Sequence, residues 1–425
     1  MKKEELIYDW NVQGIFPEKP KKIIEFDDET LRDGIQSPTI KEPSIADKVK
    51  ILNLMEEIGI NSADLGLPGA GINVVNDVTV LAKEIVDNKL NITGSCAART
   101  IKDDIVPIID ISQKTGLPLC VDMFIGSSTI RRYAEDWSIE RMLANTKGAV
   151  DFAIKEGLPV MYVTEDTTRA HPETLSILYK TAIEHGAKRI CVCDTVGHAT
   201  PYGICNLIKF VQEIVKETGV ENIKIDFHGH RDRGLSLANT IAAIIAGVDR
   251  VHGCGLGIGE RCGNTPMDQL LVNLQLMGWI EKDLTKITPY CKVVSEACDI
   301  PMPYNYPIFG EDAFRTATGV HATAVIKAMK KEGEAWLADA VYSGVPASMI
   351  GKKQLIEVGP MSGKSNIIFW LEQRNIKAEE ELIKAIFDHA KKSKKILKNE
   401  KITEIVNNHN TNDIKSECLK NLSEN

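Results

Sequence analysis

One pattern recurs eight times between residues 23 and 254 and constrains the fold more than any other feature. A short apolar run ends in polar or glycine residues, and a stretch with the spacing of an amphipathic helix follows. The apolar runs cover residues 23–26, 62–67, 92–96, 119–125, 160–163, 190–193, 223–227 and 248–254. Strands that alternate with helices form parallel sheets, so the sequence predicts an α/β fold. Eight units in about 230 residues favour a closed (β/α)8 TIM barrel over a doubly wound open sheet.

The alternation stops after Asn273, and the rest of the chain has a different character. Four prolines interrupt residues 276–320, residues 366–398 have helical spacing, and the last residues are polar. A small, mainly helical C-terminal region is therefore expected after the barrel. The predicted segments are an N-terminal extension (1–22), the catalytic barrel (23–275), a linker with a lid-type helical subdomain (276–345), and a helical subdomain with a polar, partly disordered tail (346–425).

Composition narrows the class of partner. The chain has 425 residues and a net charge of −8, which argues against nucleic acid as the main partner. Its ten cysteines form no repeated C-x-x-C pairs, so a zinc ribbon is not expected. No apolar signal segment follows Met1, and the longest apolar run, 241–248, is too short for a membrane span. We therefore expect a cytoplasmic protein with small-molecule partners and no contact with membranes.

Two histidines close the seventh apolar run. His228 and His230 stand at positions i and i+2 of a predicted strand, so their side chains point to the same side of the sheet. In a barrel the carboxyl ends of all strands meet at one rim, and Asp33 follows the first strand. One carboxylate and two imidazoles can hold a divalent metal and leave about three positions of an octahedron open. A 2-oxo acid could chelate such a metal through its adjacent keto and carboxylate oxygens.

Arg32, beside Asp33, would aim a permanent cation at an oxygen that becomes negative during reaction. Two rim histidines can also form a hydrogen-bonded pair without a metal. Mononuclear iron oxygenases use the same three ligand types, but on a different fold, and the eight strand–helix units count against them.

The residues around these groups resemble three signatures of one family. Residues 28–36, DETLRDGIQ, are similar to the first signature of the DRE-TIM metallolyase superfamily; residues 228–234, HGHRDRG, resemble the second, and residues 257–264, GIGERCGN, the third. That superfamily includes isopropylmalate, homocitrate and citramalate synthases and the hydroxymethylglutaryl-CoA lyases. The resemblance covers roughly residues 23 to 370. It implies a metal-dependent enzyme that makes or breaks a carbon–carbon bond, with a divalent metal such as Mg, Mn, Zn or Co.

A further match separates the two branches of that superfamily. Residues 314–321, FRTATGVH, resemble a segment that the synthases carry beyond the barrel, and Tyr342 is similar to their catalytic tyrosine. The resemblance therefore favours an acyltransferase that condenses acetyl-CoA with a 2-oxo acid. It also implies a homodimer in which the region of His321 and Tyr342 reaches the partner's barrel. A lyase on the same barrel is the alternative, although it has no use for that region. A non-catalytic relative would be expected to have lost the triad or Arg32, and neither is lost.

The resemblance also assigns roles residue by residue. Asp33, His228 and His230 would bind the metal, with Asn264 as a weak further ligand. Arg32 would stabilise the developing alkoxide, and Glu165, His321 and Tyr342 would serve the removal of a methyl proton from acetyl-CoA. The predicted substrate-binding residues are Gln36, Arg132, Thr195 and Arg169.

Several positions depart from the family pattern and leave the 2-oxo acid open. Ile35 and Leu256 stand where polar residues are usual and favour an apolar, branched substrate. Arg132 falls where homocitrate synthases hold a distal carboxylate, which favours a dicarboxylic acid. Arg231 and Asp122 also depart from the pattern. The chain ends before the regulatory domain that binds leucine in many isopropylmalate synthases, so leucine is not expected to inhibit it.

Overall fold

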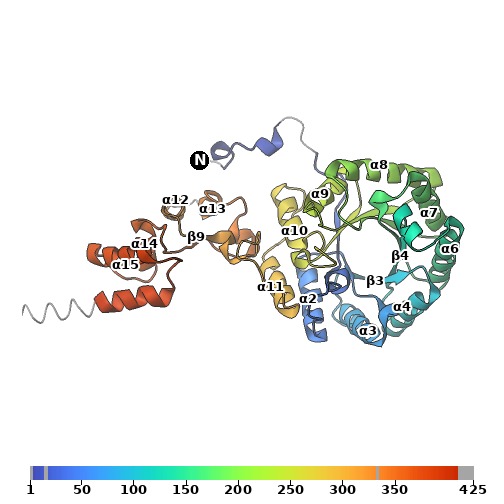
Figure 1. Ribbon diagram of the computed structural model, residues 1–425, viewed down its shortest axis with the longest axis horizontal. Helices are drawn as coiled ribbons and strands as arrows, with labels where there is room; N and C mark the ends of the chain where they lie inside the picture. The colour runs from blue at the N-terminus through green and yellow to red at the C-terminus, as the bar shows by residue number, and fades with distance from the viewer. Residues whose placement is uncertain (1–2, 14–17, 332–334, 410–425) are drawn as a thin grey trace, which may run out of the picture. The chain divides into compact units, whose positions relative to one another are not determined.

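The computed structural model describes residues 3–13, 18–331 and 335–409. The predicted barrel is confirmed: eight parallel strands follow one another around a closed sheet, in which β1 pairs with β8 (Figure 1). These strands are β1 (Glu25–Asp28), β2 (Ser62–Asp64), β3 (Thr93–Arg99), β4 (Cys120–Gly126), β5 (Val160–Glu165), β6 (Arg189–Asp194), β7 (Lys224–Gly229) and β8 (Arg250–Gly253). Each strand overlaps the apolar run that predicted it.

Helices form the outer layer of the barrel. They are α2 (Ile45–Glu57), α3 (Ile72–Asp87), α4 (Lys102–Thr115), α6 (Ile139–Lys155), α7 (Pro172–Glu184), α8 (Pro201–Thr218), α9 (Ser236–Ala246) and α10 (Met267–Leu276). The local sequence explains their limits. At the start of α8, Thr200 accepts a hydrogen bond from the backbone of Gly203, and Pro201 takes the first position. Gly219, at φ 67°, ends the helix in the left-handed region.

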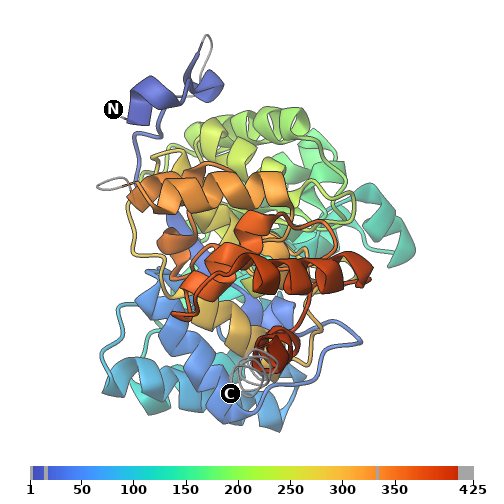
Figure 2. The same cartoon turned by 90° about the vertical axis from the view of Figure 1, so that its left-hand side faces the viewer.

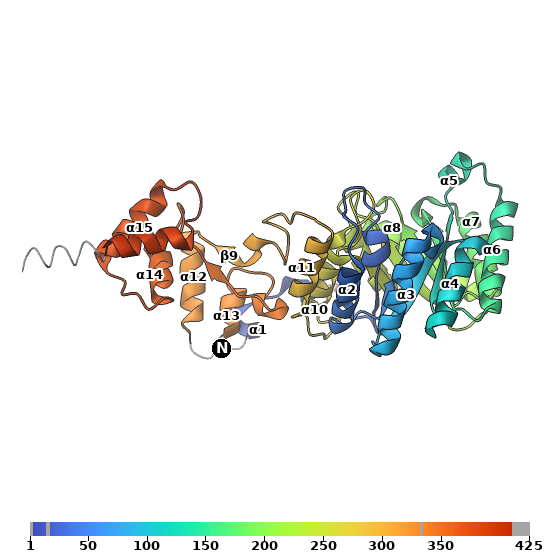
Figure 3. The same cartoon turned by 90° about the horizontal axis from the view of Figure 1, so that it is seen from below.

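One short helix departs from this layer. Helix α5 (Thr129–Ala134) directly follows β4, and Figure 3 shows it projecting beyond one end of the barrel. Because α5 begins at the carboxyl end of a strand, it stands on the rim where barrel active sites form. No helix in the described part of the chain combines the length and hydropathy that a bilayer crossing requires.

Ion pairs fill the amino-terminal end of the barrel interior, where bulky apolar side chains are more usual. Arg189 donates to Asp226 and to Glu25, each at 2.6 Å, and Arg250 donates to Asp226 at 2.6 Å. Burial opposes the charge of Asp226, but Arg250 and Arg189, with His252, hold its pKa well below the usual range. Paired charges, rather than apolar side chains, therefore fill this end of the barrel interior.

The chain divides into two compact units at Pro301. Helix α11 (Ile287–Ala297) packs against α2, so the first unit extends beyond residue 275, where the sequence placed the end of the barrel domain. The second unit holds α12 (Gly319–Met329), α13 (Ala335–Ala340), α14 (Lys364–Glu372), α15 (Glu380–Lys392) and a helix over residues 399–409. Two short parallel strands that the sequence did not predict, β9 (Arg315–Thr316) and β10 (Leu355–Ile356), join this unit.

The second unit has its own apolar core, and Figure 2 shows its helices in orange and red. Ile367 and Leu371 from α14 pack with Ile386 from α15 and with Ile402 from the last described helix. The helical spacing predicted over residues 366–398 thus corresponds to two helices rather than one. The predicted polar tail is helical to residue 409, and residues 410–425 lie outside the described residues.

A buried carboxyl joins α11 to the barrel. Asp28 in β1 accepts hydrogen bonds from the hydroxyl of Tyr290 at 2.5 Å and from the backbone of Thr30 at 2.9 Å. Burial raises the pKa of Asp28 to about 7, against the effect of these bonds. An unfolded aspartic acid ionises near pH 4, so the folded chain holds this proton more tightly between about pH 4 and pH 7. The carboxyl of Asp28 therefore contributes fully to the free energy of unfolding below about pH 4, and this contribution is lost as the pH rises through about 7.

We expect Asp28→Asn to remove this pH dependence, because an amide cannot ionise. The free energy of unfolding of the variant, relative to the wild type, should rise between pH 4 and pH 7 by up to about 4 kcal/mol. Urea unfolding at a series of pH values measures this difference. Asp110→Asn, at an exposed site on α4, controls for the loss of one carboxylate. A difference that stays constant across that range would contradict the prediction.

Candidate metal and substrate site

A cavity of about 490 Å³ opens among the carboxyl ends of the barrel strands. Seven of the site residues predicted within the barrel unit line it: Arg32, Asp33, Gln36, Glu165, Thr195, His228 and His230. Arg132, Arg169 and Asn264 do not. Residues that were not predicted as site residues also line it, among them Glu29, Asp64, Asp122, Arg131, His252, Glu260 and Arg261. The barrel rim therefore collects most of the predicted groups into one hollow.

Three of these residues form a compact ligand set. One ligand atom from each of Asp33, His228 and His230 lies within 4.8 Å of the others, and all three side chains are buried. His230 Nε2 lies 3.5 Å from Asp33 Oδ2, and the two imidazole rings are 4.9 Å apart between centroids. His228 belongs to β7, whereas Asp33 lies in the π-helical turn η2 (Thr30–Gly34) that follows β1. Such π-turns are frequent at functional sites.

The donor atoms fit a divalent metal. His228 donates through Nδ1 to Glu29 at 2.6 Å, which leaves its Nε2 as a lone-pair donor. His230 Nδ1 and Asn264 Oδ1 are buried and have no hydrogen-bond partner within the described residues. Buried polar atoms without a protein partner are rare in folded proteins, and a bound ion or water is one explanation for them. Two imidazoles, a carboxylate and a nearby amide oxygen suit Zn, Co, Mn or Mg.

The protonation states also suit metal binding, which requires a carboxylate and neutral imidazoles. Burial lowers the pKa of His230 to about 4, helped by the neighbouring His228. Burial opposes ionisation of Asp33, but Arg32, His230 and His228 outweigh it and lower its pKa. At neutral pH the site therefore holds an anionic Asp33 beside an uncharged His230.

Asn264 makes a hydrogen bond to the carboxylate of Asp33. Its Nδ2 donates to Asp33 Oδ2 at 2.6 Å. This approach depends on Gly259, at φ 139°, because a Cβ there would lie 2.2 Å from Asn264 Nδ2. Asn264 does not line the cavity, so its position supports an orienting role towards Asp33.

Arg32 bonds to three carboxylates at once. It donates to Asp64 at 2.6 Å and to Asp33 and Glu29 at 3.1 Å each. Burial opposes its charge, but Asp64, Asp33 and Glu29 together raise its pKa well above the ordinary value. The guanidinium is therefore a fixed cation that borders the metal ligands and the cavity.

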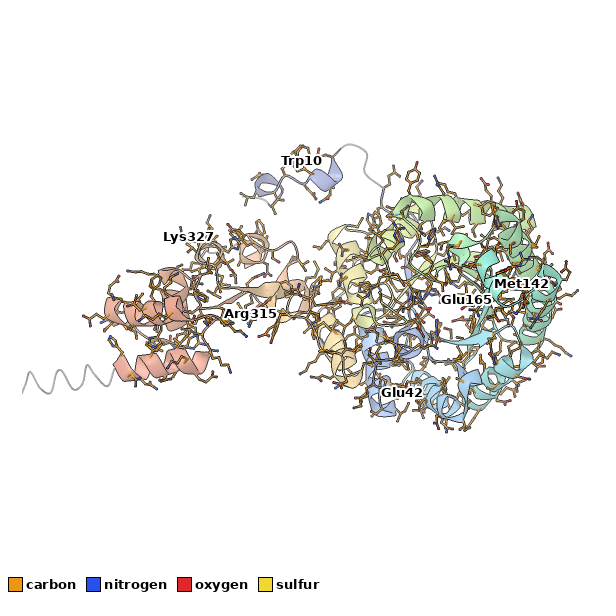
Figure 4. The ribbon with its side chains drawn as sticks, in the orientation of Figure 1. Trp10, Glu42, Met142, Glu165, Arg315 and Lys327 are labelled. Carbon is orange, nitrogen blue, oxygen red and sulfur yellow. The ribbon has the colours of Figure 1, made fainter. Side chains whose placement is uncertain are left out.

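Glu165 and Thr195 lie elsewhere on the cavity wall. Glu165 ends β5, and Figure 4 labels it within the ring of strands. Burial raises its pKa, and Arg131 and Arg32 oppose that rise. A carboxyl with a raised pKa in a cavity is a candidate acid–base group. The Thr195 hydroxyl accepts a hydrogen bond from the backbone of Asp166 at 2.8 Å and retains its own proton for a ligand.

Two of the predicted substrate-binding residues do not line the cavity. Arg169 donates twice to Asp166, both at 2.7 Å, and does not line the cavity. Arg132 does not line it either, whereas its neighbour Arg131 does. The reason is helix phase: Ser128 caps α5 by accepting from the backbone of Arg131, and adjacent helical side chains point about 100° apart. The sequence placed an arginine pair in this segment, and the rotation of helix α5, which had not been predicted, decides which of the two lines the cavity.

Three departures from the family pattern also lie away from the cavity. Ile35, Arg231 and Leu256 do not line it, so Ile35 and Leu256 give no ground for an apolar substrate. Arg231 donates to the backbone oxygen of Cys262, and the backbone of Leu256 donates to Asp268. Asp122 does line the cavity, where it is buried. The apolar wall comes instead from Leu67, Ala97, Phe124, Met161, Val163 and Val196.

In the second unit, His321 and Tyr342 come together. Their rings stack with centroids 4.1 Å apart and an interplanar angle of 27°. His321 lies in the first turn of α12, Tyr342 follows α13, and both side chains are exposed. The two residues that the family resemblance pairs in one role are therefore neighbours on one surface of this unit.

Comparison with known proteins agrees with these observations. The model of the HMGL-like family matches residues 23–294. A probable 2-isopropylmalate synthase of Methanopyrus kandleri is 32% identical over 86% of this chain and 68% of the relative. A 2-isopropylmalate synthase of Sulfolobus acidocaldarius is 31% identical over 89% of this chain and 92% of that synthase. A homocitrate synthase of Methanopyrus kandleri is 28% identical over 88% of each.

Among solved structures, the HMG-CoA lyase of Bacillus subtilis superposes with a TM-score of 0.56 at 20% identity, over 67% of this chain and 97% of the lyase. At that identity the likeness shows a shared fold only. The family match, which spans most of the barrel unit, goes further. The chain belongs to the HMGL-like, or DRE-TIM, family, and the three relatives described above are named as synthases.

Proposed function

We propose that this protein is a metal-dependent acyltransferase that condenses acetyl-CoA with a 2-oxo acid. Water then hydrolyses the resulting thioester to free CoA and a 2-hydroxy dicarboxylic or tricarboxylic acid. The observation that carries the proposal is the cavity that unites Arg32, the ligand set of Asp33, His228 and His230, and Glu165. A divalent metal held by that set would polarise the keto carbonyl. The names of the relatives, which include isopropylmalate, homocitrate and putative citramalate synthases, support the same class of reaction.

The other side chains of the site have separate roles in the reaction. Arg32 stabilises the negative charge that develops on the keto oxygen, and its three carboxylate partners keep it in place. The Thr195 hydroxyl and Gln36 bind the acid from the cavity wall. Glu165, with the stacked His321 and Tyr342, serves removal of the methyl proton from acetyl-CoA, so that the resulting carbanion attacks the keto carbon. We further propose that the His321–Tyr342 surface acts on the barrel of a second subunit in a cytoplasmic homodimer.

Release of free thiol tests this proposal. Metal-loaded protein with acetyl-CoA would be offered 3-methyl-2-oxobutanoate, 2-oxoglutarate, oxaloacetate, pyruvate and glyoxylate in turn. Thiol release that depends on one of these acids is the expected result. No release with any acid, together with cleavage of a 3-hydroxy-3-methyl acyl-CoA, would replace the synthase with the lyase alternative.

Arg131 should set the preference between mono- and dicarboxylic acids. We expect Arg131→Ala to lower the ratio of kcat/KM for 2-oxoglutarate to that for 3-methyl-2-oxobutanoate about tenfold or more, because it removes a charge-assisted hydrogen bond worth about 1.5–3 kcal/mol. Arg132→Ala is the matched control, since this neighbour does not line the cavity, and should leave the ratio within about threefold. The opposite ranking of the two variants would contradict the placement of Arg131.

A further inference from the structure

A buried chain of hydrogen bonds runs from the metal ligands into the barrel interior. Glu29 accepts from His228 Nδ1 at 2.6 Å through one oxygen and from His252 Nδ1 at 3.0 Å through the other. The second nitrogen of His252 lies 3.0 Å from Asp226 Oδ2. His252 and Asp226 are 1% and 0% exposed, so both are almost completely buried. The chain ends in the ion pairs of Asp226 with Arg189 and Arg250.

We propose that His252 is a positioning residue that acts on the metal ligand His228 through Glu29. A carboxylate that accepts from Nδ1 of a ligating histidine fixes which nitrogen carries the proton and how the ring is turned, so that Nε2 faces the metal. Glu29 can do this for His228 only while its own orientation is fixed. Arg32 reaches Glu29 at 3.1 Å from the turn that follows β1, and His252 reaches it from β8. The inference rests on the metal set of the proposed function.

His252 suits this role because both of its ring nitrogens face carboxylate oxygens. A ring that donates on both sides carries both protons and therefore a positive charge. It joins Glu29 to Asp226, and Asp226 is itself fixed by two arginines. The position of Glu29 is thus tied to the rigid, charge-compensated end of the barrel rather than to the rim loops.

Glu29, His228 and His252 could also be considered as a second metal site, because one ligand atom from each lies within 4.8 Å of the others. The existing bonds count against that reading. Both oxygens of Glu29, Nδ1 of His228 and both nitrogens of His252 already have partners at 2.6 to 3.0 Å. An ion there would have to displace these bonds, whereas His230 Nδ1 at the proposed site has no partner within the described residues.

Two variants of His252 distinguish loss of its hydrogen bond to Glu29 from loss of its positive charge. The amide nitrogen of asparagine can take the place of Nδ1, so His252→Asn can still donate to Glu29. The amide nitrogen of glutamine can take the place of Nε2, so His252→Gln can donate to Asp226 and loses the bond to Glu29. Both variants remove the same positive charge. His185→Asn, at the partly exposed His185–Asp151 pair outside the barrel, is the control for replacing a histidine.

The readout is metal affinity. Chelator-treated full-length protein would be titrated with Co²⁺ by calorimetry, and the visible spectrum of the bound ion would be recorded. We expect one ion per chain, a dissociation constant within about threefold of wild type for His252→Asn and His185→Asn, and one raised about 10- to 100-fold for His252→Gln. An altered Co²⁺ spectrum in His252→Gln alone would mark a turned His228 ring.

Each other outcome decides against a specific claim. Equal affinity of folded His252→Gln and wild type would overturn the positioning role while leaving the metal site intact. Two ions per chain in wild type and one in His252→Gln would instead identify a second metal site. Absence of Co²⁺ binding by wild type would refute the metal site of the proposed function itself. If His252→Gln does not fold, Glu29→Gln tests the same step, because its single amide oxygen cannot accept from both imidazoles.

Discussion

Replacing His230 with alanine is expected to abolish metal binding and turnover together. His230 supplies one of three ligand atoms within 4.8 Å of one another, and its Nδ1 has no hydrogen-bond partner within the described residues. Its low pKa, about 4, keeps the ring neutral and available to a metal at physiological pH. We expect the dissociation constant for Co²⁺ or Mn²⁺ to rise at least 100-fold and kcat to fall at least 1,000-fold, since substrate activation depends on the metal.

His198→Ala is the control for this experiment. His198 is an exposed histidine in the loop after β6, and its hydrogen bonds run through its backbone, which alanine retains. Calorimetric titration of metal and the thiol-release rate should therefore stay near wild type in this variant. Turnover retained by His230→Ala at saturating metal would show that the catalytic centre lies elsewhere.

Arg32→Lys is expected to lower kcat about 100- to 1,000-fold while metal binding persists. Lysine keeps the positive charge but cannot reproduce three directed bonds to Asp64, Asp33 and Glu29, so the cation no longer has a fixed place beside the reacting oxygen. Loss of one preorganised donor to a developing oxyanion costs about 2.7–4 kcal/mol in other enzymes, which corresponds to that range of rates. Arg32→Ala would leave three buried carboxylates without the Arg32 cation. We expect this variant to unfold at a lower urea concentration than Arg32→Lys.

Three measurements separate these effects of Arg32→Lys: kcat from thiol release, the metal dissociation constant, and the urea midpoint. Arg99→Lys is the matched control, because Arg99 pairs with Asp104 at a largely exposed position outside the cavity. We expect the control to change kcat less than twofold. If Arg32→Lys binds metal normally and turns over at a rate near wild type, the assigned role of Arg32 is wrong.

Much of the site could be predicted because barrel geometry converts sequence order into spatial position. Strand alternation placed His228 and His230 on one side of β7, and parallel strands brought them to the rim where Asp33 follows β1. The same alternation could have found Glu29, which stands two residues after the inward-facing Asp27 in the first strand. Nothing in the sequence marked His252, because a lone histidine in an apolar run is usually structural.

Arg131 shows the opposite case. The local sequence placed an arginine pair after the fourth strand, but a shift of one residue around the short helix α5 decided which of the two lines the cavity. Arg169 stood at the correct strand end and formed an ion pair with Asp166 instead of facing the cavity. Side-chain direction within a loop depends on the neighbours that the loop meets, and these are known only after folding.

The sequence alone determined the order of elements and the closed barrel, because hydrophobic period and strand count are local properties that add up along the chain. It also supplied the proposed metal-ligand set of Asp33, His228 and His230. The tertiary structure alone decided which charges meet inside the barrel. Asp226 lies in β7, His252 lies in β8 and Glu29 directly follows β1, and burial makes their pairing obligatory once the strands close. Local patterns specify which side of a strand is buried, whereas electrostatic partners across a barrel are set by register, which no single segment encodes.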